Sequence, residues 1–318
     1  MGLLFAVVVY GVVVGHSGYR AVRESLSSFD WWAFAIALGL SSCNYVLRFA
    51  KWQYYLRLLG IEHVRRGHSA LIFLSGFVLT VTPGKLGEVF KSAVLARTHG
   101  VPMERTAPIV LAERLTDVIA IVVLIALGSL GFQGGALWAA IGVALVALGL
   151  AFVVWDKPAR SLLALLDARP RLQAFRPAFE RAYQSLRVVA APTALLWPVL
   201  LSVVGWGLEG LSLHLLLVGF GQHPSLAFSV FFYASATLAG AVIPVPGGLG
   251  VTEAMLVEQM VRVALVPHPV ATAAMLLIRG STLWWAVLVG FVALGWLRLV
   301  FPRELGQEPR SSETLNRA

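Results

Sequence analysis

The sequence has little charge and a single cysteine. Only 13% of its 318 residues are charged, whereas 58% are hydrophobic and the mean hydropathy is +0.80. A soluble domain needs more polar groups than this to cover its surface, so the composition excludes a soluble globular protein. A lone cysteine, Cys43, also excludes a disulfide within the chain. The chain is therefore predicted to be an all-α polytopic membrane protein.

Sequence motifs for nucleotide binding, nucleophilic catalysis and metal binding are missing as well. "PGK" and "GGLG" lack both the Walker spacing and a preceding strand, and no G-x-S-x-G occurs. The seven histidines show no ligand spacing. We therefore predict no catalytic residue, no cofactor and no metal site. The net charge of +9 comes from Lys and Arg that fall mostly in short links, where they act as topology signals, so no nucleic-acid partner is predicted.

Apolar runs predict six full membrane spans, because crossing about 30 Å of hydrocarbon takes roughly 20 helical residues. They lie at 2–18, 30–56, 106–131, 134–155, 193–219 and 270–300. Two further apolar stretches, 68–97 and 225–266, are interrupted by "TPGKLGE" and "PVPGGLGVTE". Pro-Gly pairs disfavour a continuous helix, so each stretch is predicted to be a hairpin of two helices that either cross the membrane fully or re-enter it. The break residues are Pro83, Gly84, Gly87, Pro246, Gly247, Gly248 and Gly250.

The distribution of Lys and Arg predicts the orientation. These residues are concentrated in the links at 57–67, 98–105 and 156–192 and after residue 298, but are absent from "GFQGG", "GFGQHPS" and "VPHP". The positive-inside rule then places both termini in the cytoplasm, although Arg20 and Arg23 in the 16–29 link oppose it. The resulting division is a first membrane repeat at 1–155, a basic, partly helical cytoplasmic link at 156–192, a second membrane repeat at 193–301 and a disordered tail at 302–318.

The two interrupted stretches resemble each other. "PGKLGE" at 83–88 parallels "PGGLGVTE" at 246–253, and an arginine follows each at a similar distance, as Arg114 and Arg279. An ionisable residue precedes each, as Arg48 and Glu209. Each half would contain three full crossings, an odd number, so the second copy would be inserted upside down. Inverted repeats with broken helices are a design of secondary transporters, whose hairpin tips line a polar cavity.

Charges inside apolar segments mark the candidate site, because each is costly at membrane depth. Asn44, Arg48, Lys51 and Tyr55 recur at helical spacing and predict one polar stripe facing the bundle. The substrate-binding candidates are Asn44, Arg48, Lys85, Glu88, Arg114, Asp117, Glu209, Glu253 and Arg279.

Several of these charges have a structural alternative. In "ERLTD", the spacing suits an intrahelical Arg114–Asp117 pair beside Glu113 as a leftover carboxylate, and this pair could serve the fold as well as a substrate. Lys91 and the Glu258–Arg262 pair are interpreted as structural or snorkelling charges. Arg279 has no acidic residue within one turn, which would leave it for Glu209, Glu253 or an anionic ligand. Lys85 and Arg279 are read as substrate contacts whose neutralisation leaves the fold intact.

"PGKLGEVFKS", "ERLTD", "PVPGGLGVTE" and "RGSTLWWAVLVG", in this order, resemble the lysylphosphatidylglycerol synthase transmembrane region, or flippase-like domain family. The resemblance runs from about Asn44 to Gly290. It implies a multi-pass protein of the bacterial inner membrane, related to the lipid-flipping half of the multiple peptide resistance factor, although these 318 residues hold no soluble aminoacyl-transferase domain. The matched positions are Asn44, Arg48, Pro83, Gly84, Lys85, Gly87, Glu88, Glu113, Arg114, Asp117, Pro246, Gly247, Gly248, Gly250, Glu253 and Arg279.

The leading functional hypothesis is translocation of a polar lipid, anionic or aminoacylated, between leaflets. Lys85 and Arg48 would hold its phosphate at one hairpin and Arg279 at the other, while Glu88 and Glu253 would bind a cationic headgroup or a coupling proton. A lipid-binding or scaffold subunit that presents lipid to a separate enzyme is the alternative, and an intramembrane transferase is the least supported.

The predicted orientation can be tested by labelling. After Cys43 is replaced, single cysteines introduced at 131–135 or 219–224 should react with an impermeant thiol reagent added from outside, whereas cysteines at 157–190 should not. Labelling of the basic link from outside would reverse the orientation and remove the argument for an inverted repeat.

Overall fold

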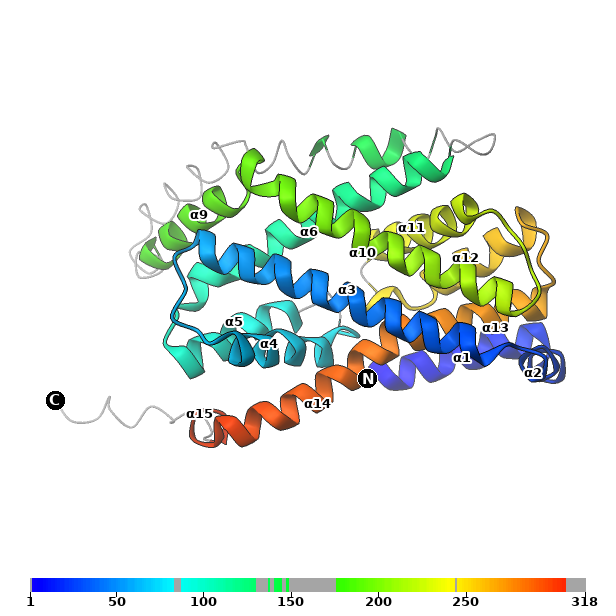
Figure 1. Ribbon diagram of the computed structural model, residues 1–318, viewed down its shortest axis with the longest axis horizontal. Coiled ribbons are helices and arrows are strands. Elements are labelled where there is room, and N and C mark those ends of the chain that lie inside the picture. The colour runs from blue at the N-terminus through cyan, green and yellow to red at the C-terminus, as the bar shows by residue number, and fades with distance from the viewer. Residues whose placement is uncertain are drawn as a thin grey trace.

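The computed structural model describes residues 2–82, 87–129, 137, 140–144, 147–148, 176–243 and 245–306, and every regular element in this part of the chain is helical (Figure 1). Several predictions fall outside it. They concern Pro83, Gly84 and Lys85, the side chain of Glu88, most of the span at 134–155, the link at 156–175 and the tail from residue 307.

Long apolar helices form the centre of the fold. α3 (Trp31–Leu58), α10 (Pro192–Gly219) and the continuous helix His268–Val300 are each long and apolar enough to cross a bilayer. The last of these consists of α13 (His268–Arg279), a π-helical turn η5 (Gly280–Trp284) and α14 (Trp285–Val300). α1 (Gly2–Ser17) is shorter, and α6 (Met103–Ser129) is long but carries buried charges. The predicted spans at 2–18, 30–56, 106–131, 193–219 and 270–300 therefore each coincide closely with helical structure.

Local sequence signals set where several helices begin. The side chain of Asp30 accepts a hydrogen bond from the Trp32 N–H at 3.1 Å and caps α3. Ser225 does the same for α11 (Leu226–Val242), where its hydroxyl accepts from the Phe228 N–H at 3.2 Å. α10 begins with Pro192, whose missing N–H costs nothing at a first helical position. Such caps satisfy backbone donors that have no partner within the helix.

Both interrupted stretches form helical hairpins. The first consists of α4 (Arg66–Ser75), its 3₁₀ extension η1 (Gly76–Leu79) and α5 (Gly87–His99). In the second, α11 leads through η4 (Pro246–Gly248) into α12 (Val251–Arg262). Gly247, Gly248 and Gly250 have φ angles of 63°, 69° and 89°, which glycine adopts without strain, so the chain can reverse here. The arms run antiparallel, since α11 and α12 are joined by a 2.9 Å hydrogen bond from Gln259 to Ser235.

Short helices occupy two predicted links and the start of the predicted tail. α2 (Tyr19–Ser27) lies in the 16–29 link and packs on α13. α9 (Arg176–Val189) lies in the basic link, as the expectation of a partly helical link requires, and packs on α6. α15 (Pro302–Gly306) shows that the first residues of the predicted disordered tail are ordered.

The two halves of the chain pack crosswise. α3 lies along α10, and the two helices are antiparallel. The Asp30 N–H just before α3 donates to Gly219 O at the end of α10 at 3.0 Å, whereas Lys51 in the second half of α3 contacts Ser202 in the first half of α10. α4 and η1 pack against α14, the last long helix of the second half. α11 packs against α6, the last long helix described in the first half. Each hairpin is thus held by the other half of the chain.

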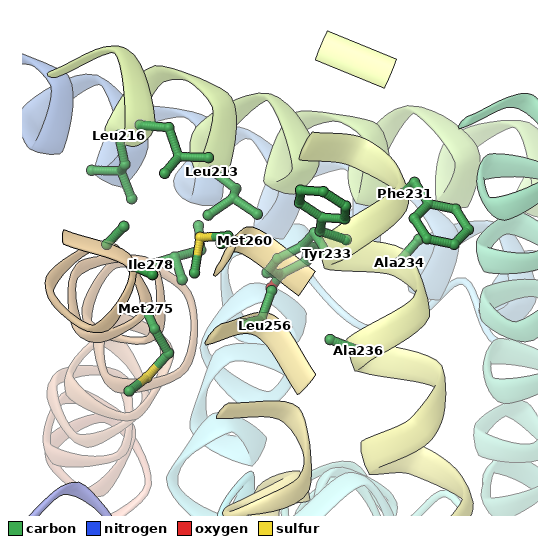
Figure 2. Packing of buried hydrophobic residues seen from close by; sticks show 14 of the residues in the cluster. Leu213, Leu216, Phe231, Tyr233, Ala234, Ala236, Leu256, Met260, Met275 and Ile278 are labelled. Carbon is green, nitrogen blue, oxygen red and sulfur yellow. The ribbon is translucent and has the colours of Figure 1, made fainter. Parts of the chain in front are cut away.

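Two large hydrophobic clusters and a small one fill the space between these helices. The largest joins α10, α11, α12 and α13, and Figure 2 shows Leu213, Met260 and Ile278 from α10, α12 and α13 near one another. The second joins α3, α4, α5 and α14 around Trp52 and Phe73.

Close contact between α14 and η1 gives a test of the crosswise packing. A Cβ atom added to Gly290 would lie 2.5 Å from the backbone N of Val78, whereas one added to Gly295 on the same helix would meet nothing within 4 Å. Gly290→Ala should therefore destabilise the protein by about 1–3 kcal/mol through overpacking. Gly295→Ala, the matched control, should leave the thermal unfolding temperature in detergent unchanged or raise it. Equal unfolding temperatures would contradict the described contact.

Candidate functional site

The predicted polar stripe on α3 does face the bundle. Asn44, Lys51 and Tyr55 are buried, and Arg48 between them is partly buried. These residues follow one another at intervals of three or four, so they project from one side of the helix toward α6 and α10. Through this stripe, polar side chains of α3 contact those of α6 in the first half and α10 in the second half.

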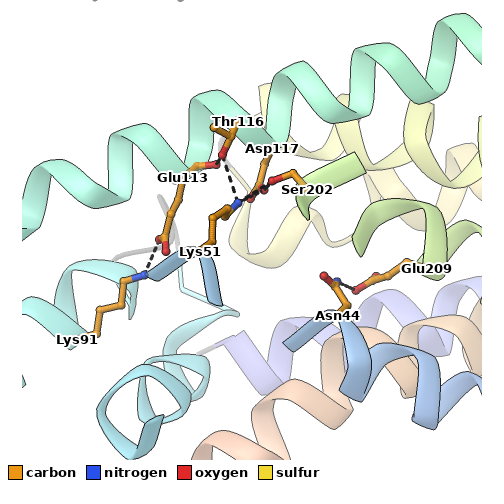
Figure 3. Close-up of polar contacts among 8 residues, drawn as sticks. All are labelled: Asn44, Lys51, Lys91, Glu113, Thr116, Asp117, Ser202 and Glu209. Atoms are coloured by element: carbon orange, nitrogen blue, oxygen red, sulfur yellow. Dashed lines mark hydrogen bonds and ion pairs between the residues drawn. The ribbon is translucent and has the colours of Figure 1, made fainter. Parts of the chain in front are cut away.

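Lys51 lies in a cage of oxygen atoms (Figure 3). Its ammonium is 2.7 Å from Asp117 Oδ1, 2.8 Å from Ser202 Oγ and 3.2 Å from Thr116 Oγ1. Ser202 in turn donates to Asp117 at 3.0 Å. Because Lys51 is 1% exposed, its charge depends entirely on these partners, which come from α6 and α10. Asp117 therefore stabilises the contact between α3, α6 and α10.

Lys91 forms a second buried pair. Its ammonium is 2.5 Å from Glu113 Oε2, and it lies over the rings of Trp52 and Phe73 at 4.6 Å and 5.2 Å from their centroids. A cation over an aromatic face gains additional electrostatic attraction in a dry site. The structural interpretation of Lys91 agrees with these contacts. The expectation that Glu113 is a leftover carboxylate is wrong, because α5 packs on α6 and brings Lys91 to it.

Glu209 on α10 is held by neutral groups. Asn44 Nδ2 donates to Glu209 Oε1 at 2.5 Å, and the Tyr233 hydroxyl donates to Glu209 Oε2. Glu209 and Tyr233 are both buried. Asn44 and Glu209, two of the predicted site residues, are therefore in direct contact across the α3–α10 interface (Figure 3).

Arg279 and Glu253 close the tip of the second hairpin. Arg279 Nε lies 2.6 Å from Glu253 Oε1, and its Nη2 donates to the Gly247 carbonyl at 2.8 Å. The other oxygen of Glu253 accepts from the Gly250 N–H at 2.6 Å, as expected of an acidic residue in the first turn of a helix. Glu253 is fully buried and Arg279 is 7% exposed. This arrangement ties the glycine-rich break to α13, just before the π-helical turn, a feature often found at functional sites.

A cavity lies where the two halves meet. α3 contributes Arg48, α10 contributes Glu209, and α13 contributes Arg279. Thr80 after η1 and Gly248 in the second break also line it, so both hairpins reach the same space. Its volume is about 100 Å³, which is room for several water molecules or a small polar group. Between α3 and α10, Arg48 and Asp117 border a narrow gap that has no room for a water molecule.

The predicted site residues thus divide into two groups. Arg48, Glu209 and Arg279 line the cavity at the junction of the two halves, and Asn44 and Glu253 contact Glu209 and Arg279. Asp117 borders the narrow gap between α3 and α10, and Arg114 lies near it on α6, partly buried. Sequence reasoning missed the aromatic wall of Tyr45, Trp206 and Tyr233, because buried aromatic residues are ordinary in any apolar helix. In the described part of the chain, no three His, Cys, Asp or Glu side chains are grouped to hold a metal ion.

These features define a helical membrane protein with a cavity lined by charged groups at the junction of two hairpins. The chain matches the model of the family described as "Lysylphosphatidylglycerol synthase TM region" over residues 1–290, and it belongs to that family. A UPF0104 membrane protein of Methanocaldococcus jannaschii is 23% identical over 246 residues, which cover 74% of this chain and 99% of the relative. The family associates this membrane protein with lipid handling.

The sequence predicts that Arg279→Gln leaves the fold intact, but the buried ion pair between Arg279 and Glu253 predicts a loss of stability. Removing the Arg279 charge leaves the fully buried Glu253 carboxylate without its cation, which costs roughly 3–5 kcal/mol, so we expect marked loss of thermal stability rather than an intact fold. Arg262→Gln provides the matched control, because Arg262 pairs with Glu258 on the same hairpin at an exposed position. Exposed pairs contribute about 0–1 kcal/mol, so this variant should unfold near the wild-type temperature. Similar unfolding temperatures for both variants would show that the buried pair does not hold the hairpin.

Proposed function

We propose that this protein moves the polar headgroup of a membrane lipid between the two leaflets while the acyl chains stay in the bilayer. The observation that carries the proposal is the cavity at the junction of the two halves, which both hairpins line and which contains Arg48, Glu209 and Arg279. Polar and charged groups inside a membrane protein normally mark a path for a polar substrate.

The packing supports an inverted repeat. α3 and α10 occupy equivalent places in the two halves and run antiparallel, so a two-fold axis that relates them is perpendicular to both helices. The hairpin contacts follow the same two-fold relation. α4 of the first half packs on α14 of the second half, and α11 of the second half packs on α6 of the first. Such an axis lies in the membrane plane, which lets a central site be approached from either side. We propose that both termini lie in the cytoplasm and that the protein resides in a bacterial inner membrane.

The cavity chemistry favours an anionic headgroup. Arg48 offers a guanidinium to a phosphate, and the backbone around the second break offers further polar groups. Its volume of about 100 Å³ fits part of a headgroup rather than a whole lipid, so the acyl chains would have to remain outside. Lys85 and Glu88 are proposed as further headgroup contacts from their place in the sequence motif "PGKLGE". Asp117 and Arg114 are assigned mainly to holding the bundle.

Leaflet exchange in liposomes tests this function. Fluorescent phosphatidylglycerol in vesicles containing only this protein should lose its leaflet asymmetry at least tenfold faster than in protein-free vesicles. Arg48→Gln should remove most of this gain, because it removes the cavity charge that attracts the phosphate. Arg187→Gln, the matched control at an exposed position on α9, should not.

Three outcomes would oppose the proposal. Retention of labelled lipid without faster exchange would favour a binding subunit that presents lipid to a separate enzyme. A new headgroup species in lipids from an overexpressing strain would favour an intramembrane transferase. Equal exchange by the Arg48 variant and the wild type would remove the cavity from the transport path.

A further inference from the structure

Glu209 differs from the other buried carboxylates of the described chain. Glu113, Asp117 and Glu253 each face the cationic group of Lys91, Lys51 or Arg279 at 2.5–2.7 Å. Glu209 instead contacts Asn44 and Tyr233, which are both neutral. A carboxylate held by neutral groups can gain a proton without breaking an ion pair, whereas protonating any of the other three would strand a buried cation.

The neighbours of Glu209 can accommodate either protonation state. A tyrosine hydroxyl can donate or accept, so a protonated Glu209 could donate to the Tyr233 oxygen while Asn44 continues to donate to the other carboxyl oxygen. Tyr233 itself lines the cavity, where its own proton could then be directed toward a water molecule or a bound anion. Proton uptake therefore requires a reorientation of hydroxyl groups rather than a rearrangement of helices.

Charged and titratable groups face Glu209 from several elements. α3 presents Tyr45 and Arg48, α11 presents Tyr233, and α13 presents Arg279 backed by Glu253 of α12. Arg48 and Arg279 attract the Glu209 carboxylate. Further along the interface, α3 and α6 carry the Lys51–Asp117 pair, and His214 lies on α10 itself. Glu253 compensates Arg279, and among the described residues that line the cavity Glu209 supplies a carboxylate.

We propose that Glu209 is a proton-binding site that couples proton movement to lipid movement, an inference that rests on the proposed function. When an anionic headgroup enters the cavity, its negative charge disfavours a second negative charge on Glu209, so the carboxylate takes one proton from cavity water. By thermodynamic reciprocity, the bound proton strengthens binding of the anion. After the cavity opens to the other side, the headgroup leaves and Glu209 returns the proton to water there. One proton then crosses with each headgroup.

Infrared difference spectroscopy of the purified protein tests the proton site without requiring transport. A pH titration should show a protonated carboxyl band that Glu209→Gln removes. Glu258→Gln, the matched control at an exposed position on α12, should leave this band unchanged. Tyr233→Phe removes one donor to the carboxylate, so the band should persist to higher pH than in the wild type. Phosphatidylglycerol added to the detergent should shift the band in the same direction, whereas phosphatidylcholine should not.

Liposomes with a pH difference across the membrane test the coupling. Exchange of labelled phosphatidylglycerol should be faster toward the alkaline side in the wild type, and Glu209→Gln should lose this directionality. If the wild type exchanges lipid at a rate that ignores the pH difference but follows a sodium gradient, the proton site is wrong while the proposed function stands. If the wild type exchanges no lipid, the proposed function fails, and the infrared titration still decides whether Glu209 binds a proton. A titration identical in wild type and Glu209→Gln would overturn the proton site.

Discussion

A charge inside a bundle surrounded by hydrocarbon must be compensated by protein, and this constraint organises the structure described here. Lys51 joins α3 to α6 and α10 through Asp117 and Ser202. Lys91 joins α5 to α6 through Glu113. Each contact is buried, so the loss of one partner would leave the other without water to stabilise it. These ion pairs therefore favour the observed register between the helices, together with the close packing of the hydrophobic clusters.

The same constraint fixes the wall of the cavity between the two halves. The Arg279–Glu253 pair stabilises the glycine-rich break, so the second hairpin presents a defined wall to the cavity rather than a loose loop. Arg48 and Glu209 line that cavity from α3 and α10, between the paired charges.

Crosswise packing of the hairpins explains why the break regions meet at the centre. α4 and η1 rest on α14 while α11 rests on α6, so each hairpin is clamped by a helix from the other half of the chain. The close approach of Gly290 to Val78 shows how tightly one such clamp is packed. A movement of one half would therefore carry the other half's hairpin with it, which is the mechanical property that the proposed alternation requires.

Local features were accessible from the sequence because they depend only on neighbouring residues. Apolar runs, Pro-Gly pairs and three- or four-residue spacing located the long helices, the second break and the inward-facing stripe from Asn44 to Tyr55. The charge pairing was not accessible in this way. The spacing in "ERLTD" allowed Glu113 to remain without a partner, but helix rotation and the approach of α5 bring Lys91 to it and Lys51 to Asp117. Likewise, nothing near Glu209 in the chain pointed to Tyr233, because that contact arises only when α11 packs beside α10. Spacing along a helix restricts which side chains share a face, whereas the partner of a buried charge is decided by which other helix brings an opposite charge or a donor to that face.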